Sequence, residues 1–576
     1  MVTLTIDNKP ITVEEGTTIL NAAKKLGIKI PTLCYLKNIN EIGACRICVV
    51  EIEGSPRLSA ACNTVVEEGM VVYTNSARVR QARKYNIEMI LSQHNCHCPT
   101  CLRSGNCSLQ KMANNLNIYN LDYETKVDEM NWDMSYPLIR DNSKCIKCLR
   151  CVTICENVQS IGVWEVNGTG ANMKIATRDG LNIKKTSCTL CGQCITHCPV
   201  GALRERDDTG KVLSAIYDPE KITVVQLAPA VRTAWGENLN LPKEKASVNR
   251  LVACLHALGI DYVFDTDFTA DLTVMEEGTE FINSFKKNKP LMTSCCPGWV
   301  RFLIKEYPDM LPHLSSAKSP QQMFGAVAKT YFAQKLGVDP SKIFSISIMP
   351  CIAKKYECEV PEVSDSGAGQ DVDVVLTTRE LTRLLRACHI DPEALEDEPF
   401  DSPMGLGTGA GVIFGTTGGV MEAALRSAYY MLTGKNPDPD AFKDVRGMGG
   451  WREATFDIKG VPIKVAVASG LSNARKLVEA IRSGEVDYDF VEVMACPGGC
   501  AGGGGQPIQD GKELAERRGE TLYEIDANSR MRFSHENTAI QQIYKEFFGE
   551  PLSELAHHLL HTVQSSWTLD KEKCDH

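Results

Sequence analysis

The amino-acid sequence predicts a multidomain protein that combines α+β and α/β architecture. Its 576 residues are roughly four times the size of a typical domain. Of its 25 cysteines, 16 lie between Cys34 and Cys198 in four groups of four. From about residue 210 onward, apolar β-branched runs alternate with helical stretches, which indicates a large α/β domain with buried strands. The chain therefore divides near residue 210.

Composition excludes several classes of function. The net charge of -10 and the pI near 5.7 argue against a nucleic-acid partner, because phosphate binding needs a concentrated basic surface. Apolar runs fall short of the roughly 20 residues of a spanning helix, so we expect no membrane contact. The opening MVTLTIDNKPITVEEGTTIL alternates like a strand and lacks the features of a signal peptide, which predicts a cytoplasmic protein. Because thiols stay reduced there, the cysteines indicate metal ligation.

The first cysteine group is typical of plant-type 2Fe-2S ligation. It places a CxxC loop, GACRIC, between two outlying cysteines, so that its members are Cys34, Cys45, Cys48 and Cys62. VTLTI and ITV form a candidate hairpin, TTILNAAKKLGI has helical spacing, and RICVVEIEG is rich in β-formers. We expect a β-grasp 2Fe-2S ferredoxin-like domain over residues 1–78; a zinc site or unrelated structural cysteines are the alternative.

The second group, HNCHCPTCLRSGNC, offers six candidates for four ligand positions. They are His94, Cys96, His97, Cys98, Cys101 and Cys107. A histidine beside CxxC and a further cysteine suits a soft metal site. Residues 79–125 therefore form a candidate cluster segment, for which zinc is a serious rival on spacing alone.

The third and fourth groups, CIKCLRCVTIC and CTLCGQCITHC, both read CxxCxxCxxxC. In two-cluster bacterial ferredoxins, three cysteines of such a run hold one 4Fe-4S cube and the fourth crosses to the other cube. The predicted ligand sets are Cys145, Cys148, Cys151 and Cys198 for one cube and Cys188, Cys191, Cys194 and Cys155 for the other. We expect a two-cluster domain over residues 136–209. Four cluster sites in series make an electron relay, so the reaction belongs at its far end.

Three cysteine motifs in residues 210–576 follow apolar strand-like runs. They are PLMTSCCPGW with Cys295 and Cys296, IMPCIAKK with Cys351, and VEVMACPGGCAGGGGQP with Cys496 and Cys500. The carboxyl ends of strands are where α/β sheets place their sites. Converging thiolates therefore suggest a metal cofactor, against the alternative of buried structural cysteines. We expect Cys254, Cys358, Cys388 and Cys574 to be buried structural cysteines or exposed thiols.

These three motifs resemble the signature motifs of FeFe-hydrogenases, and the upstream cysteine groups match the long clostridial form of that family. The resemblance implies reversible reduction of protons to dihydrogen at an H-cluster. This is a 4Fe-4S cube joined through one cysteine to a diiron subcluster with CO, cyanide and a bridging azadithiolate. The implied cube ligands are Cys296, Cys351, Cys496 and Cys500, the last being shared. The resemblance also implies one 2Fe-2S cluster and three accessory 4Fe-4S clusters, one of them held by His94, Cys98, Cys101 and Cys107.

The resemblance further implies a proton relay. The free thiol of Cys295 would exchange protons with the bridging amine, and the relay would continue through Glu277, Ser315 and Glu280. Spacing alone favours a solvated acidic face for the two glutamates. Ser284 stands where an arginine usually ends the relay, so Lys286, Lys287 or water would take its place.

The implied pocket has one departure from the family pattern. Lys354 matches a lysine that binds a cyanide of the diiron site. Ala230 stands where many relatives carry a serine that bonds the other cyanide, so that donor is lost. Gln321, Met349, Phe414 and Met494 match pocket-lining positions, although Met and Phe in apolar runs are more often plain core.

Expected partners are ferredoxin or a similar redox protein, the proteins that mature the diiron site, and an NAD-linked flavoprotein subunit if the chain belongs to an electron-bifurcating complex. GLGTGAG misses the GxGxxG spacing, so any NADH chemistry needs a second polypeptide. Two rival readings remain. One is an iron-sulfur wire like the large subunit of NADH:quinone oxidoreductases, and the other is a non-enzymatic assembly or sensory relative. The intact TSCC and CPGGC motifs favour the enzyme.

Overall fold

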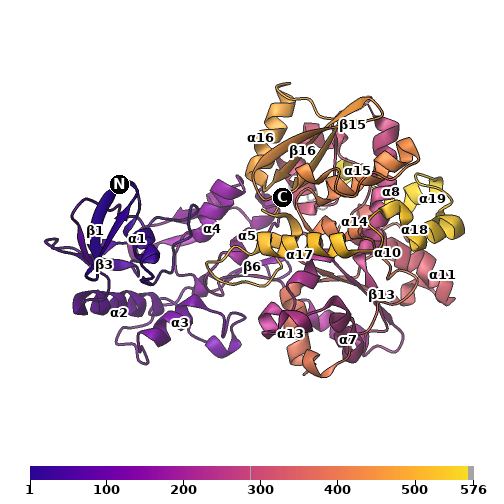
Figure 1. The fold of residues 1–576 in the computed structure, drawn as a ribbon. Coiled ribbons are helices and arrows are strands. Elements are labelled where there is room, and N and C mark those ends of the chain that lie inside the picture. Colours follow the sequence, from indigo (N-terminus) through magenta and orange to yellow (C-terminus); the bar gives the residue numbers. More distant parts are fainter. Residues whose placement is uncertain (286, 288, 568–576) are drawn as a thin grey trace.

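The computed structural model describes residues 1–285, 287 and 289–567. Figure 1 shows the cysteine-rich part as an extension from one side of the larger C-terminal part, with the N-terminus near its far end. None of the described helices combines the length and the apolar character needed to cross a bilayer.

The N-terminal domain is a five-stranded mixed sheet in the order β2-β1-β5-β3-β4. Its first two strands form the expected antiparallel hairpin, and β1 also pairs in parallel with β5, which is the arrangement of a β-grasp fold. Helix α1 begins after Thr18, whose hydroxyl accepts a hydrogen bond from the Asn21 N–H. The elements are β1 (Val2–Ile6), β2 (Lys9–Val13), α1 (Ile19–Lys25), β3 (Val49–Ile52), β4 (Ser59–Ala60) and β5 (Val71–Tyr73).

The middle of the chain consists of short elements around the remaining cysteine groups. A long helix leads into the second group, and two small antiparallel pairs, β6 with β9 and β7 with β8, frame the third and fourth groups. The elements are α2 (Ala77–Leu91), α3 (Ser108–Asn115), β6 (Leu138–Arg140), α4 (Arg150–Thr153), β7 (Trp164–Asn167), β8 (Lys174–Thr177), α5 (Gln193–Thr196) and β9 (Leu203–Glu205).

The C-terminal part contains two separate four-stranded sheets. The first, β11-β10-β13-β14, is wholly parallel. In the second, β12-β17-β16-β15, only β15 runs antiparallel. The strands are β10 (Ile222–Leu227), β11 (Tyr262–Asp265), β12 (Leu291–Met292), β13 (Ile343–Met349), β14 (Val374–Thr377), β15 (Trp451–Ile458), β16 (Val461–Ser469) and β17 (Phe490–Met494).

Helices surround both sheets. The longest, α8, is buried along most of its length and begins at Asp265, whose carboxylate accepts from the Asp267 N–H. The helices are α6 (Thr209–Ile216), α7 (Val248–Leu258), α8 (Thr266–Ser284), α9 (Pro297–Glu306), α10 (Pro320–Val327), α11 (Ala333–Leu336), α12 (Ala353–Glu357), α13 (Thr378–Ala387), α14 (Gly409–Val412), α15 (Gly419–Thr433), α16 (Leu471–Arg482), α17 (Ala515–Asn528), α18 (Thr538–Ile543) and α19 (Glu554–Leu560).

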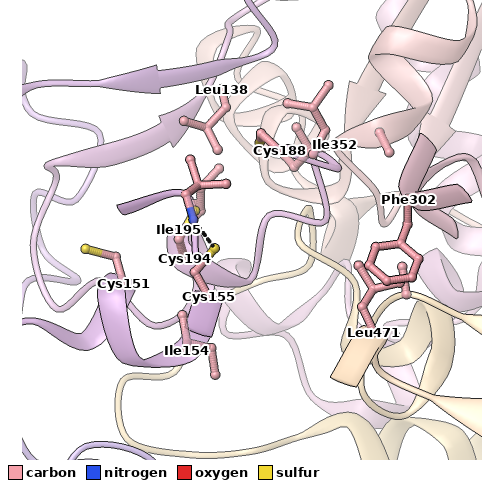
Figure 2. Close-up of a cluster of buried hydrophobic side chains, with 14 of the residues drawn as sticks. Leu138, Cys151, Ile154, Cys155, Cys188, Cys194, Ile195, Phe302, Ile352 and Leu471 are labelled. Atoms are coloured by element: carbon pink, nitrogen blue, oxygen red, sulfur yellow. Dashed lines mark hydrogen bonds between the residues drawn. The ribbon is translucent and has the colours of Figure 1, made fainter. Parts of the chain in front are cut away.

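One apolar core crosses the boundary between the two-cluster domain and the C-terminal part. Ile154 and Ile195 from the former belong to the same buried cluster as Phe302, Ile352 and Leu471 from the latter, as Figure 2 shows. A shared core fixes the relative position of two units more firmly than a linker does. The relay domain is therefore docked on the C-terminal part.

Candidate catalytic centre and its electron relay

Loops that follow β10, β12, β13 and β17 meet around a cavity of about 80 Å³. Each of the two sheets contributes two of these loops, and each loop begins at the carboxyl end of its strand. The lining includes every cysteine of the three C-terminal motifs and every pocket residue implied by the resemblance. These are Cys295, Cys296, Cys351, Cys496, Cys500, Lys354, Ala230, Gln321, Met349, Phe414 and Met494.

The glycine-rich loop after Cys496 comes so close to the Cys351 loop that side chains would not fit between them. A Cβ on Gly503 would lie 2.1 Å from the carbonyl oxygen of Pro350. A Cβ on Gly505 would lie 2.9 Å from the Cys351 amide nitrogen. The glycines therefore bring two cysteine-bearing loops together.

Four thiols of the cavity, those of Cys296, Cys351, Cys496 and Cys500, are weakly acidic; Cys496 is buried and the other three are partly buried. Burial raises the pKa of each thiol, that of Cys351 to about 12. Iron binds thiolate and displaces such protons, so a purely sulfur donor set suits an iron-sulfur cube. The apolar remainder of the cavity leaves room beside these sulfurs for a further group. The residues present thus fit the H-cluster.

Lys354 is buried beside the cavity and positioned by Glu357. Its ammonium donates to Glu357 Oε2 at 2.8 Å and to the Cys295 carbonyl oxygen at 3.1 Å. Burial lowers the pKa of Lys354, but the charge and hydrogen bond of Glu357, together with the charges of Cys351 and Cys295, outweigh that effect, so the pKa is raised. Glu357 also accepts from Ser319 and Gln321. Sequence reasoning missed Glu357, although its place three residues after Lys354 was a usable signal.

Cys295, Glu277, Ser315 and Glu280 form one connected group. The Ser315 hydroxyl donates to Glu280 Oε2 at 2.6 Å and also hydrogen-bonds Glu277. Glu277 is only 1% exposed, so the solvated acidic face is wrong for this residue. Burial, and then the charge of Glu280, raises the pKa of Glu277 to about 8. Burial and the charge of Glu277 raise the pKa of Cys295 well above its usual value.

Neither Ser284 nor, within the described residues, Lys287 is hydrogen-bonded to the outer end of this group. The Ser284 hydroxyl donates to the Phe281 carbonyl at 3.4 Å, so it is directed into its own helix. Lys287 is exposed, and Lys286 lies outside the described residues. Cys574, expected to be a structural or exposed thiol, also lies outside them.

Two buried charged residues near the centre were missed. Glu492 on β17 accepts from the N–H groups of Gly418 and Met421, both at 2.7 Å, and burial raises its pKa to about 7. A lone acid inside the apolar run FVEVM was the available signal. Arg518 on α17 donates to the Ala501 carbonyl and so supports the glycine-rich loop, with no signal in its local sequence.

The first cysteine group is arranged as two pairs of thiols. Cys34 hydrogen-bonds Cys45, and Cys48 hydrogen-bonds Cys62. The bond from Cys34 lowers the pKa of Cys45 to about 6. Each outlying cysteine is thereby placed beside one cysteine of the CxxC loop, which suits a two-iron cluster.

The six candidate ligands of the second group lie in different environments. The His94 side chain is buried, and its Nδ1 has no hydrogen-bond partner among the described residues. A buried imidazole with a free lone pair is a suitable metal ligand. Cys96 instead bonds the His94 carbonyl at 3.3 Å, and His97 is exposed. Burial raises the pKa of Cys107, which lies near Cys101.

The third and fourth groups form two cavities of about 20 Å³ each, and the ligand runs cross between them. One cavity is lined by Cys145, Cys148, Cys151 and Cys198, and the other by Cys155, Cys188, Cys191 and Cys194. Figure 2 shows Cys194 and Cys155 together, with the Cys151 sulfur pointing away from them. No three His, Cys, Asp or Glu side chains of the described residues are placed to hold a single metal ion.

Both outer sites touch the first of these cavities. The Asn40 amide donates to the carbonyl oxygens of Cys34 at 2.8 Å and Cys148 at 3.1 Å. A Cβ on Gly201 would lie 2.6 Å from the Cys101 sulfur. The 2Fe-2S loop and the histidine-containing segment therefore approach the same place from two sides.

The second cavity adjoins the catalytic centre. The Cys496 sulfur lies 3.6 Å from the Cys191 carbonyl oxygen. A Cβ on Gly504 would lie 2.4 Å from that oxygen and 2.6 Å from the Gly192 Cα. These backbones are in contact, so the sites form a continuous branched series.

Five known families match successive parts of the chain. The family described as iron only hydrogenase large subunit, C-terminal domain, matches residues 221–504, and iron hydrogenase small subunit matches residues 512–563. Upstream, a 2Fe-2S iron-sulfur cluster binding domain matches residues 1–77. The NADH-ubiquinone oxidoreductase-G iron-sulfur binding region matches residues 83–121, and a 4Fe-4S dicluster domain matches residues 144–202.

Relatives match over nearly the whole length. The chain is 48% identical to the NADP-reducing hydrogenase subunit HndD of Solidesulfovibrio fructosivorans, over 98% of both chains. It is 40% identical to iron hydrogenase 1 of Clostridium pasteurianum, over 97% of this chain and 99% of the relative. The solved structure of apo [FeFe]-hydrogenase HydA1 from Chlamydomonas reinhardtii is 40% identical with a TM-score of 0.56, covering 62% of this chain and 98% of that one.

Proposed function

This chain belongs to the iron-only, or FeFe, hydrogenases, and we propose roles for its individual residues on that basis. It is the catalytic subunit, an oxidoreductase that interconverts protons and dihydrogen, with accessory 2Fe-2S and 4Fe-4S domains. The observation that carries the assignment of residues is the dry cavity in which four thiols, Cys295 and Lys354 meet.

Cys296, Cys351, Cys496 and Cys500 would hold the cube of the H-cluster, with Cys500 shared with the diiron subcluster. Ala230, Gln321, Met349, Phe414 and Met494 would enclose that subcluster. When bound, the H-cluster supplies the redox chemistry and the site at which hydrogen is made or split.

The protein's part in the reaction is to hold charge and move protons. Lys354, kept cationic by Glu357, would bind an anionic ligand of the diiron subcluster. Cys295 would pass a proton inward and recover one from Glu277, which is protonated at neutral pH. Ser315 would connect Glu277 to Glu280. The apolar walls exclude water, so protons move by this route.

The remaining cysteines would form the electron relay. Cys34, Cys45, Cys48 and Cys62 would hold a 2Fe-2S cluster, and His94, Cys98, Cys101 and Cys107 a 4Fe-4S cluster. Both would feed the cube of Cys145, Cys148, Cys151 and Cys198. That cube would pass electrons to the one held by Cys155, Cys188, Cys191 and Cys194, next to the catalytic centre. The close backbone contacts between the sites support this order.

An infrared spectrum tests the catalytic assignment. The protein would be matured and purified without oxygen and examined where metal-bound carbonyl and cyanide absorb. We expect bands that shift under hydrogen or added carbon monoxide. A blank spectrum in protein whose other clusters are filled, after competent maturation, would contradict the assignment.

We propose ferredoxin, or a similar redox protein, as the electron partner. A second candidate is membership of a multi-subunit complex with an NAD-linked flavoprotein, favoured by the relative that is named as a subunit of an NADP-reducing hydrogenase. Co-purification with a flavoprotein from the native host would support the complex. A homogeneous monomer with full ferredoxin-linked activity would support the first candidate.

We also propose the domain limits 1–78, 79–125, 136–209 and 210–576, which agree in order with the family matches. Dedicated maturation proteins would supply the diiron subcluster. A cytoplasmic location is favoured by the free thiols outside the ligand sets, such as Cys254 and Cys358.

A further inference from the structure

The two carboxylate oxygens of Glu280 have different serine partners. Oε2 accepts from Ser315 at 2.6 Å, on the side that leads to Glu277. Oε1 accepts from the Ser316 hydroxyl at 2.9 Å, and the Ser316 backbone N–H donates to Glu280 as well. Glu280 therefore connects the inner relay to a second, unassigned hydroxyl.

Ser316 continues to a histidine near the end of the chain. His561 Nδ1 lies 2.9 Å from Ser316 Oγ. Because the Ser316 hydroxyl proton is directed at Glu280, its oxygen is left to accept the Nδ1–H of His561. Residues 560–562 pair with residues 316–318 through the bonds Lys318 N to Leu560 O and Thr562 N to Ser316 O, both 2.8 Å. This pairing fixes the histidine against the serine.

The other side of His561 faces a buried acid. Its Nε2 lies 3.0 Å from Glu276 Oε2, and Glu276 also accepts from the Tyr544 hydroxyl and from the Leu552 N–H. Glu276 is fully buried and His561 is 4% exposed. A carboxylate oxygen in that position can accept the Nε2–H of His561.

An exposed aromatic ring covers one face of His561. The exposed His557, one turn earlier on α19, lies flat against it, with ring centroids 5.1 Å apart and planes 5° apart. Among the described residues, the charged and titratable groups around His561 include Glu276 and Glu280 from α8, His557 from α19, Tyr544 through its bond to Glu276, and Lys318, whose ammonium bonds the Leu559 carbonyl.

We propose that His561 and Ser316 carry protons between solvent and Glu280. This inference rests on the proposed function. In the inward step, the His561 imidazolium gives its Nδ1 proton to Ser316 Oγ while the Ser316 hydroxyl proton passes to Glu280 Oε1. His561 and Glu280 end neutral, and no electron moves. The histidine takes its next proton from solvent past His557, and hydrogen oxidation runs the same steps in reverse.

The test compares variants of the matured full chain. His561→Gln keeps a hydrogen-bonding amide but cannot carry a proton, and Ser316→Ala removes the linking hydroxyl. We expect each to reduce turnover by about 10²-fold, as for loss of an acid-base group. The double variant should lose no more than the single ones, because both act on one path. Ser316→Thr, which retains a hydroxyl, should restore most of the rate, and added imidazole should rescue His561→Ala.

A matched control is His535→Gln. His535 is buried and hydrogen-bonds the Ser427 hydroxyl at 3.1 Å, as His561 does with Ser316, but it does not touch the relay. Its turnover should be close to wild type.

The infrared bands of the H-cluster are recorded for every variant. Intact bands with lost turnover, rescued by Ser316→Thr, support the relay. Intact bands with wild-type turnover in both His561→Gln and Ser316→Ala overturn it without touching the proposed function. If His561→Gln does not assemble, Ser316→Ala and Ser316→Thr decide. Missing bands in the wild-type protein would instead overturn the proposed function.

Discussion

Cys295 differs from the other cysteines of the cavity in what lies next to its thiol. Its main charged neighbour is Glu277, whereas the four proposed cube ligands face one another. We therefore expect Cys295→Ala to lower hydrogen turnover by about 10²-fold or more, because it removes a proton donor. Cluster content should stay unchanged. Hydrogen evolution with a reduced dye, alongside an infrared spectrum, measures both.

Cys254→Ala is a suitable control for that variant. Cys254 is buried in α7 and does not line the cavity, so its loss should affect stability and leave turnover intact. Wild-type turnover in Cys295→Ala would contradict the role given to the thiol.

Glu277 gives the centre a defined pH response. Its pKa of about 8 means that the folded protein holds this proton at pH 7 and loses it as the pH rises through about 8. A carbonyl band of a protonated carboxyl group should therefore fade with a midpoint near pH 8 in difference infrared spectra. The band should be absent from Glu277→Gln.

The same shift affects stability. A folded-state pKa raised above the ordinary 4.5 means that the stabilising effect of the bound proton is complete below about pH 4.5 and is lost as the pH rises through about 8. Glu277→Gln should flatten the decline of Tm over that range. An infrared carbonyl band that persists unchanged in Glu277→Gln would show that a carboxyl group other than Glu277 titrates near pH 8.

At the scale of elements, the glycine-rich loop after β17 has little tolerance for side chains. Gly504→Ala would force a Cβ against the Cys191 carbonyl and the Gly192 Cα, both of them rigid backbone. We expect a loss of roughly 1–3 kcal/mol in stability, the usual cost of overpacking. Ferredoxin-linked turnover should fall as the two sites move apart.

Gly210→Ala is the matched control, because that glycine lies in α6 with open space around its Cβ position. It should be neutral or slightly stabilising. Thermal unfolding of Gly504→Ala and Gly210→Ala provides the comparison. Equal Tm values would show that the glycine-rich loop can shift to accommodate a Cβ at Gly504.

Sequence reasoning succeeded for elements whose signal is local. The hairpin β1/β2, helix α1 and the strands β10, β13 and β17 follow their periodicity, and two of the three cysteine motifs follow β13 and β17. The division of the C-terminal strands between two sheets was not predicted. Strand β12 has only two residues, Leu291 and Met292, too few for a periodic pattern.

The parts of the site that escaped prediction are those built from distant segments. Ser316 and His561 are 245 residues apart, and Asn40 meets Cys148 across 108 residues. No spacing rule connects such positions, because tertiary packing alone brings them together. The cysteine sets could be grouped because their spacing within each run encodes the geometry of a cube.

At the scale of the whole molecule, the relay has two outer branches and one inner path. Cys48→Ala and Cys98→Ala each remove a proposed ligand of one outer site, so part of the ferredoxin-linked turnover should survive through the other branch. Cys194→Ala affects the inner site that adjoins the catalytic centre and should abolish nearly all of it. Steady-state rates with reduced ferredoxin measure the difference, and equal losses in all three variants would contradict a branched relay.

The crossing of Cys155 and Cys198 between the two small cavities also bears on how the protein is built. With clusters in place, the cube of Cys155, Cys188, Cys191 and Cys194 would close a loop of chain that lies wholly inside the longer loop closed between Cys151 and Cys198 by the other cube. Such cross-links restrict the unfolded chain more than either does alone. Neither half of the domain can be completed before the other, so metal loading and folding become a single cooperative event.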